Sequence, residues 1–315
     1  MAKFLAKRLV ALVGILFVVS IGTFLLIHLL PGDPTVTILG PSDNAHNRAV
    51  LMQQLGLDKP IFEQYGIWIV NVLQGNLGQS FVTHQTVMST LRHSVPIDLE
   101  LVVISQVIAL GAAIPLAIAS AKRPNGLLDK ITTTTSFAML ALPPFIIIVV
   151  MVMFFAIDIH VFPGPGSYVP LMEDPVSNLH TMILPSLVLA AGSVVVYFRL
   201  LRGDLISTLQ EEFIVMARSK GLSDRYIMWR HALRPSSLSL LAAAGLNIGG
   251  LVAGAFVVEY LLQLPGLGYA LVNSIQQVDY LSVQGITLFV AVVVVCLNFV
   301  IDFLFTIVDP RIARD

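Results

Sequence analysis

No residues of this 315-residue chain stand at the spacing of a known catalytic site. The dipeptide Gly-Lys is absent, so the chain lacks the G-x-x-x-x-G-K-[ST] loop that cradles nucleotide phosphates. The serine pattern G-x-S-x-G and the zinc pattern H-E-x-x-H are absent as well. The single cysteine, Cys296, excludes an internal disulfide and a cysteine-based metal site. We therefore expect no enzyme activity, cofactor site or metal site on this chain.

The densest group of charges lies in the segment 211–235, EEFIVMARSKGLSDRYIMWRHALRP, which carries five Lys/Arg residues. Apolar residues recur every four positions from residue 205, just before this segment, to residue 217 inside it. This spacing predicts one face of a helix. They are Leu205, Leu209, Phe213 and Ala217. Gly221 fits the C-terminal cap of that helix, with Arg218 and Lys220 favourably placed in its last turn.

A second, shorter helix is expected after Gly221, with Ser223 as its N-terminal cap. Leu222, Tyr226, Trp229 and Leu233 would form its apolar stripe. Pro235 is expected to end it. The periodicity leaves two interpretations open, which are a two-helix docking element and a basic loop that lies on anionic lipid.

The elements that position this segment are predicted to cross a membrane. Only 12% of the residues are charged, about half the usual share, and the mean hydropathy is +0.86. A membrane helix needs about 20 largely apolar residues. Six stretches qualify, over residues 9–30, 99–121, 131–157, 182–201, 238–262 and 284–308.

The basic residues predict the orientation of these spans. When alternate connections are placed on the same side, 15 of the 18 Lys/Arg residues fall on the side of the two termini. Only 3 fall on the other side, all within the long connection 31–98. The positive-inside rule therefore predicts that both termini and the segment 211–235 are cytoplasmic.

The connection 31–98 is too long and too polar for a turn, and we expect a small extracytoplasmic element that is largely helical. A helical pattern runs over 61–73, and Pro60 suits its start. The external connections 158–181 and 263–283 carry turn residues, including Pro265, Gly266 and Gly268. These three residues, together with Glu259 near the outer end of the fifth span, are candidate gate or outer-loop positions.

The segment 211–235 resembles a known element. Ala217-x-x-x-Gly221 followed by His231-Ala232-Leu233-Arg234-Pro235 resembles the EAA loop of ABC importer permeases, the coupling element that docks into a groove on the ATPase subunit. The chain departs from the common pattern, because Val215 replaces the glutamate and one extra residue separates Leu233 from Pro235. The run A-R-S-K-G-L at 217–222 is similar to the dipeptide/oligopeptide branch.

Further motifs of that branch occur in the same order along the whole chain. They are P-G-D-P at 31–34, L-G-L-D-K-P at 55–60, G-N-L-G-Q-S at 75–80, V-E-Y at 258–260, P-G-L-G at 265–268 and D-P-R at 309–311. Each motif alone is weak, but the ordered set is specific. The chain is therefore identified as similar to DppB/OppB-type permeases.

This resemblance implies an all-α polytopic membrane protein with six transmembrane helices and the type I ABC importer permease fold. It implies a cytoplasmic start and extra first helix over 1–30, an extracytoplasmic segment over 31–98, and a cytoplasmic C-terminus over 309–315. A five-helix core would fill 99–308 and include a coupling loop at 202–236. The resemblance assigns coupling to Ala217, Arg218, Lys220, Gly221, Tyr226, Trp229, Leu233 and Pro235.

The resemblance also implies the partners and the cargo. The chain would pair as a heterodimer with a DppC/OppC-like second permease in the inner membrane, and would bind lipid but no nucleic acid. Two ATP-binding subunits (DppD/DppF-like, or one fused chain) would carry ATP and Mg, and an extracytoplasmic binding protein would deliver peptides. Nickel or haem is the alternative cargo. An ion-coupled secondary transporter is the alternative of another class, and it would want grouped acids at mid-membrane depth.

Overall fold

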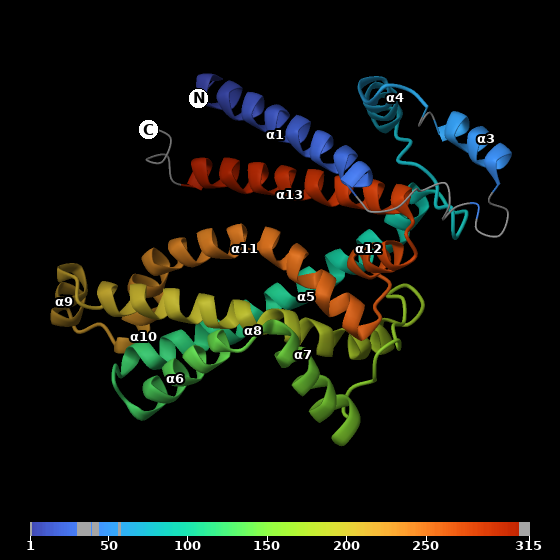
Figure 1. Cartoon of the computed structure of the whole chain (residues 1–315). Coiled ribbons are helices and arrows are strands. Elements are labelled where there is room, and N and C mark those ends of the chain that lie inside the picture. The colour runs from blue at the N-terminus through green and yellow to red at the C-terminus, as the bar shows by residue number, and fades with distance from the viewer. Residues whose placement is uncertain (1, 30–38, 40–43, 56–57, 309–315) are drawn as a thin grey trace. The chain divides into compact units, whose positions relative to one another are not determined.

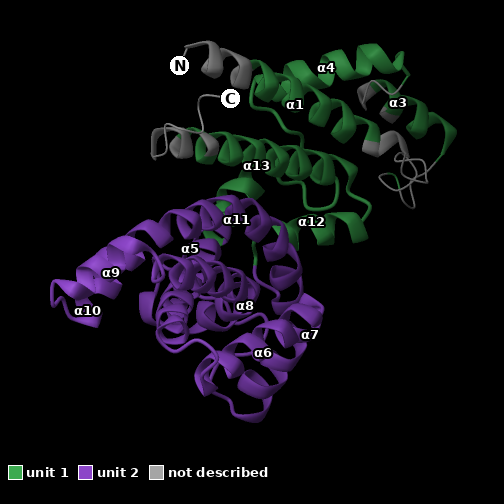
Figure 2. Cartoon of the chain, turned by 90° about the vertical axis from the view of Figure 1, so that its left-hand side faces the viewer, with its two compact units in different colours: residues 1–97, 265–315 green, residues 98–264 purple. Residues whose placement is uncertain are grey.

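The computed structural model describes residues 2–29, 39, 44–55 and 58–308 (Figure 1). The regular elements of these residues are helices, and one isolated β-bridge pairs Gln79 with Thr86. The chain divides into two compact units (Figure 2). Unit 1 contains residues 1–97 and 265–315, and unit 2 contains residues 98–264.

The described residues contain four helices that are long and apolar enough to cross a membrane. They are Val87–Lys122, Pro175–Thr208, Asp224–Leu262 and Tyr280–Ile301. A bent pair of helices, Leu127–Ala141 with Pro144–Asp158, makes a fifth if the pair counts as one span. The first expected span corresponds to a 28-residue helix, α1 (Ala2–Leu29), whose described apolar part is the shorter stretch Val10–Leu25.

Unit 1 is built around two long helices that lie side by side, α1 and α13 (Figure 1). Its elements are α1 (Ala2–Leu29), α3 (Ala45–Leu55), α4 (Ile61–Leu73), α12 (Leu267–Gln276) and α13 (Tyr280–Val308). Asp279 begins α13 as a cap, because its carboxylate accepts hydrogen bonds from Ser282 N and Ser282 Oγ. The helix expected over 61–73 is confirmed as α4, with Pro60 directly before it.

A close approach inside unit 1 depends on Gly285. A Cβ atom at this position would lie 2.8 Å from Val87 Cγ1 and 2.9 Å from the carbonyl oxygen of Leu77. The carbonyl is backbone, so the chain itself must move to admit a methyl group. We expect Gly285→Ala to lower the free energy of unfolding by about 1–3 kcal/mol, measured by denaturant titration in detergent.

Gly22→Ala is the matched control for Gly285→Ala, because a Cβ atom on Gly22 of α1 meets no atom within 4 Å. Its stability should equal or exceed that of the parent chain, since alanine favours a helix over glycine. Equal midpoints for the two variants would show that the approach at Gly285 is not tight.

Helix α5 (Val87–Lys122) begins twelve residues before the expected second span at 99. Thr86 caps it, because its hydroxyl accepts a hydrogen bond of 3.2 Å from Ser89 N. The first turns carry Arg92 and His93 and are therefore not continuously apolar, so the apolar pattern predicts a later start for this helix. The helix has 36 residues, so it is about 54 Å long and exceeds the ~30 Å hydrocarbon core.

Unit 2 is built on α8 and α11, which pack side by side (Figure 1). Its elements after α5 are α6 (Leu127–Ala141), α7 (Pro144–Met151), the π-helix η2 (Val152–Asp158), α8 (Pro175–Thr208), α9 (Glu212–Ser219), α10 (Asp224–Tyr226), the π-helix η3 (Ile227–Ala232) and α11 (Leu233–Leu262). Asp174 caps α8 by accepting from Val176 N and Ser177 N. The hydrogen bond from the Ser177 hydroxyl also holds the pKa of Asp174 below its usual value.

The third expected span, 131–157, is broken rather than merely kinked. Helices α6 and α7 meet at an angle of 108° at the Pro143–Pro144 pair. A residue before proline is driven into extended conformation, and both Leu142 and Pro143 adopt it, with ψ of 129° and 138°. Pro144 then starts α7, where its missing N–H costs nothing.

Candidate functional site

The segment that the sequence singles out forms a compact hairpin of short helices at one end of α8 and α11. Helix α9 ends in a left-handed glycine, Gly221, with φ of 76°. Gly221 N donates to Arg218 O at 2.9 Å, and Leu222 N donates to Ala217 O at 3.3 Å. This pair of bonds is the Schellman motif, which satisfies the carbonyls of the last turn and reverses the chain.

The second helix starts where the sequence predicts and ends far beyond it. Ser223 caps α10, and its hydroxyl accepts from Tyr226 N at 3.4 Å. The expectation that Pro235 ends this helix is wrong, because α10, η3 and α11 follow one another without a break to Leu262. The π-helix explains this: Leu233 N bonds to Met228 O, five residues back, and the wider turn makes room for the proline ring.

Buried side chains hold this hairpin onto the long helices. Ile214 and Ala217 of α9 are buried, as are Ile227, Met228 and Ala232 of η3. They belong to one core cluster with residues of α5, α8 and α11. At the base of the hairpin, Thr208 Oγ1 and Ser236 Oγ lie 3.0 Å apart. The hairpin is thus a rigid extension of the helix bundle of unit 2.

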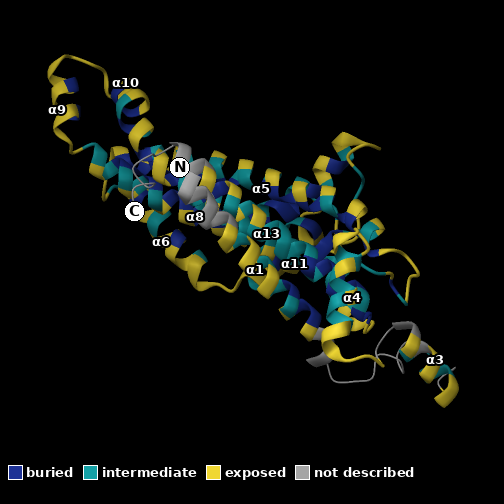
Figure 3. Ribbon diagram, turned by 90° about the horizontal axis from the view of Figure 1, so that it is seen from above, coloured by how far each residue is buried: buried dark blue, intermediate teal, exposed yellow. Residues whose placement is uncertain are grey.

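Much of α9 and α10 is exposed (Figure 3). Tyr226 is 50% exposed and Trp229 is 54% exposed, whereas Leu233 is partly buried against the core cluster. The expected single stripe is therefore divided, and its aromatic residues face away from the core. The stripe expected on the first helix is confirmed in part, because Leu205 and Ala217 are buried and Leu209 packs against the core cluster. It does not lie on one helix, since α8 ends at Thr208 and α9 begins at Glu212, and Phe213 is exposed while Ile214 is buried.

The hairpin also carries exposed charged residues. Arg218, Lys220, Arg225 and Arg230 are all exposed, and they outnumber the exposed acids Glu211, Glu212 and Asp224. One weak ion pair joins Arg218 Nε to Asp224 Oδ1 at 3.7 Å. Exposed aromatic and arginine side chains together are typical of the residues that dominate protein–protein interfaces.

The other candidate positions lie in separate parts of the chain. Glu259 is fully buried in α11 of unit 2. The other three belong to unit 1. Pro265 O accepts from Ser94 Oγ at 2.9 Å, Gly266 precedes α12, and Gly268 is buried in that helix. These three residues lie at the start of α12.

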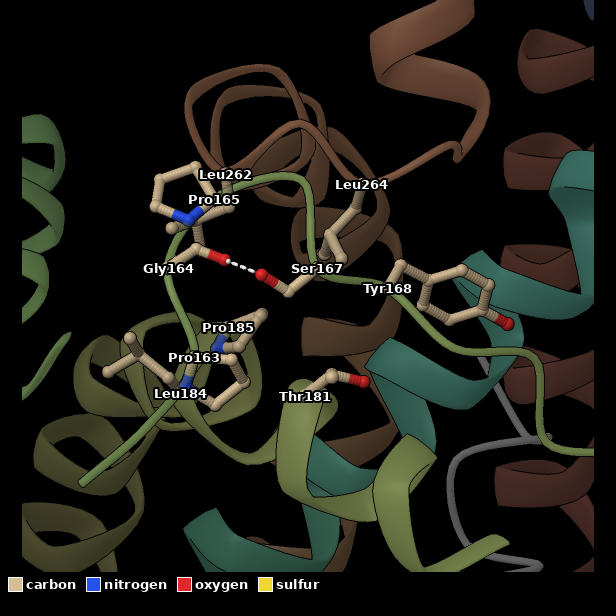
Figure 4. Close-up of a pocket in the computed structure, with 10 residues that line it drawn as sticks. All are labelled: Pro163, Gly164, Pro165, Ser167, Tyr168, Thr181, Leu184, Pro185, Leu262 and Leu264. Atoms are coloured by element: carbon tan, nitrogen blue, oxygen red, sulfur yellow. Dashed lines mark hydrogen bonds between the residues drawn. The ribbon is translucent and has the colours of Figure 1, made fainter. Parts of the chain in front are cut away.

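A small pocket lies in unit 2 beneath the loop that joins η2 to α8 (Figure 4). Its lining is mostly proline and leucine, from Pro163, Pro165, Leu184, Pro185, Leu262 and Leu264. The Ser167 hydroxyl donates to Gly164 O at 2.7 Å and fixes the loop over it. Burial raises the pKa of Tyr168 on this loop, and the carboxylates of Glu100 and Glu173 add to the effect.

A polar network between three membrane-spanning helices was not predicted from the sequence. Tyr197 OH donates to Gln106 Oε1 at 3.1 Å, and Asn247 Nδ2 donates to Tyr197 OH and to Ser193 Oγ at 3.0 and 2.7 Å. Gln106 Nε2 reaches the carbonyl oxygen of Ala244 at 3.3 Å. Amides within apolar spans were the available signal, because such residues need partners in the membrane.

A bidentate ion pair was also not predicted. Arg202 Nε and Nη2 of α8 donate to the two carboxylate oxygens of Asp129 at the start of α6, at 2.5 and 2.7 Å. Asn125 N adds a third hydrogen bond to the same carboxylate at 2.8 Å. The side chain of Asp129 is 4% exposed and that of Arg202 is 24% exposed, so the pair is shielded from water.

Comparison with known proteins identifies the family of this fold and hairpin. Residues 113–314 match the family described as binding-protein-dependent transport system inner membrane component, and residues 1–102 match the N-terminal part of the same component. The oligopeptide transport system permease protein AppB of Bacillus subtilis is 33% identical over 99% of both chains. The glutathione transport system permease protein GsiC of Escherichia coli K12 is 31% identical, also over 99% of both chains. The chain belongs to the family of binding-protein-dependent transport system inner membrane components.

Proposed function

We propose that the chain is one permease subunit of an ABC importer for peptides or peptide-like cargo such as glutathione. The names of relatives that match nearly the full length support the cargo class. A second, homologous permease completes the translocation pathway. Two ATP-binding subunits in the cytoplasm hold ATP and Mg, and an extracytoplasmic binding protein delivers the peptide. The chain itself is a membrane permease and not an enzyme.

In this proposal the chain crosses the inner membrane six times, with α1 as a span added before a five-helix core. Both termini lie in the cytoplasm, and the strong excess of Lys/Arg on that side supports this orientation. The segment 31–98 is then extracytoplasmic. The hairpin of α9, α10 and η3 is cytoplasmic, on the same side as the ATPases.

The observation that carries the proposal is the construction of this hairpin. Its inner face is buried in the core of the spanning helices, and its outer face presents Tyr226 and Trp229. A rigid element of this kind transmits the movement of a bound ATPase to the membrane helices. Closure of the ATPases on ATP then rocks unit 2 as a body, which is one way to alternate access to a central site.

Reconstitution tests this function. We expect an affinity-tagged chain, purified from its native membrane, to retain a second permease and at least one chain with a P-loop. In proteoliposomes, this complex should accumulate radiolabelled glutathione or a labelled dipeptide only when ATP and the binding protein are both supplied. Uptake driven by a proton or sodium gradient in the absence of ATP would contradict the proposal. Accumulation of nickel or haem in place of peptide would correct its cargo.

A further inference from the structure

Helix α4 packs against the side of α1 through an aromatic cluster. Tyr65 OH lies 2.8 Å from Ser20 Oγ. The Tyr65 ring meets Phe24 edge-on with centroids 5.4 Å apart, and it meets Phe17 at 6.5 Å. The Trp68 ring lies 5.7 Å from that of Phe24. All of these residues belong to unit 1, so the two helices form a defined contact.

The contact lies within α1, well before its C-terminal end. Ser20 precedes Leu29, the last residue of the helix, by nine residues, which corresponds to about 13 Å along the axis. The apolar stretch Val10–Leu25 contains Phe17, Ser20 and Phe24. If α1 crosses the bilayer, Tyr65 therefore reaches to the level of the acyl chains, and α4 lies beside the span and not above it.

A second side of α4, next to the side that packs against α1, is also apolar. Phe62 is 87% exposed and Leu73 is 81% exposed, and Val70 is half-exposed beside them. Phe62 and Leu73 share one arc of the helix, because 3.6 residues complete a turn, and Val70 lies at the border of this arc next to Glu63. Glu63, Gln64 and Asn71 occupy the neighbouring arc. The helix thus has a mainly polar strip, which also contains the exposed Ile67, between two apolar faces.

The length and ends of α4 fit a helix that lies along a membrane surface. Its 13 residues span about 20 Å, which is too short to cross the ~30 Å hydrocarbon core. An exposed ion pair of 2.9 Å between Lys59 and Glu63 marks its start, and the exposed residues Gln74–Asn76 follow its end. Both ends therefore reach water, as in interfacial helices.

We propose that α4 is an interfacial helix that lies in the bilayer leaflet at the C-terminal end of α1. Its exposed arc of Phe62 and Leu73, with Val70 at the border, contacts lipid acyl chains, as do the exposed residues Val18 and Leu25 of α1. The occupant of this arc is lipid because a water-soluble partner does not reach the depth fixed by the Tyr65–Ser20 contact. The proposal requires only that α1 lies in the membrane, and it holds whatever the cargo.

Site-directed spin labelling of the complex in phosphatidylcholine nanodiscs tests this placement. Cys296 is the only cysteine, so Cys296→Ala gives a background for single labels. Nitroxides are attached at Phe62→Cys and Leu73→Cys, and at Glu63→Cys as the matched control from the polar strip one residue away. We expect oxygen to relax the labels at 62 and 73 at least three-fold more than a water-soluble nickel chelate does, with the order reversed at 63.

Two outcomes would overturn the proposal. Relaxation of the labels at 62 and 73 by the nickel chelate to the same extent as the label at 63 would place α4 in water. Protection of both labels from oxygen and from nickel would show that a protein surface covers the arc instead of lipid. Both labelled side chains are exposed, so the substitutions remove no core contact, and either site reports the result if the other fails to fold.

Discussion

Replacing Tyr226 and Trp229 together by alanine is expected to abolish ATP-driven uptake while the chain stays folded. Both side chains are about half exposed on the hairpin, and their neighbours Ile227 and Met228 are buried in the core. Exposed aromatic residues at the centre of an interface each contribute about 2 kcal/mol or more to binding, which is about 30-fold in affinity per residue. The double variant should therefore bind the ATPases at least 100-fold more weakly.

The measurement is peptide uptake and ATP hydrolysis by the same proteoliposomes, with subunit content determined by gel filtration. Met172→Ala is the control, since Met172 is exposed on the loop before α8, far along the chain from the hairpin. Ile227→Ala is a second control that distinguishes a loss of docking from a loss of folding. Ile227 is buried, so this substitution should reduce the yield of folded chain. Full uptake by a folded Tyr226→Ala/Trp229→Ala complex would rule out the coupling role of this surface.

The substitution Asp129→Ala is expected to cost the largest amount of stability, about 3–5 kcal/mol, because it leaves the Arg202 guanidinium shielded from water without its partner. The pair connects α6 to α8, and α8 leads into the hairpin. The loss should appear as a lower unfolding midpoint in a detergent thermal scan.

Removing both charges separates the ion pair from the space that it fills. The double variant Asp129→Leu/Arg202→Met should recover most of the lost stability, since apolar residues of similar volume replace buried ion pairs well. Lys59→Ala is the matched control, because the Lys59–Glu63 pair is exposed and its loss should leave the midpoint nearly unchanged. An Asp129→Ala midpoint equal to that of Lys59→Ala would show that the buried pair is not stabilising.

Local signals in the sequence predicted the elements that depend on neighbouring residues. Pro60 and the apolar pattern after it gave the bounds of α4, and Gly221 marked the end of α9 because only a left-handed residue closes that helix. The prediction that Pro235 ends the helix was wrong. The π-helix before Pro235 shifts the backbone hydrogen bonds by one residue, and a proline can then follow without ending the helix. Charged early turns likewise hid the first third of α5.

Contacts between residues that are far apart along the chain could not be predicted from the sequence. Asp129 and Arg202 are 73 positions apart, and Tyr197 and Gln106 are 91 positions apart, so no periodicity relates them. The surface of the hairpin was partly predictable: the sequence named Tyr226 and Trp229, but it did not show that their helix turns them outward while Ile227 and Met228 face the core. That division depends on packing against α5 and α8.

Helices α10, η3 and α11 form one continuous helical segment in unit 2, which can act as a lever. Its 39 residues, Asp224–Leu262, extend over about 58 Å. Asn247 sits near the middle and is tied to α8 by hydrogen bonds to Ser193 and Tyr197, so it can act as a fulcrum. Leu262, at the far end, lines the pocket under the loop of Ser167. We expect a force on Tyr226 to move that pocket in the opposite direction, and a flexible joint inserted between them to weaken this movement.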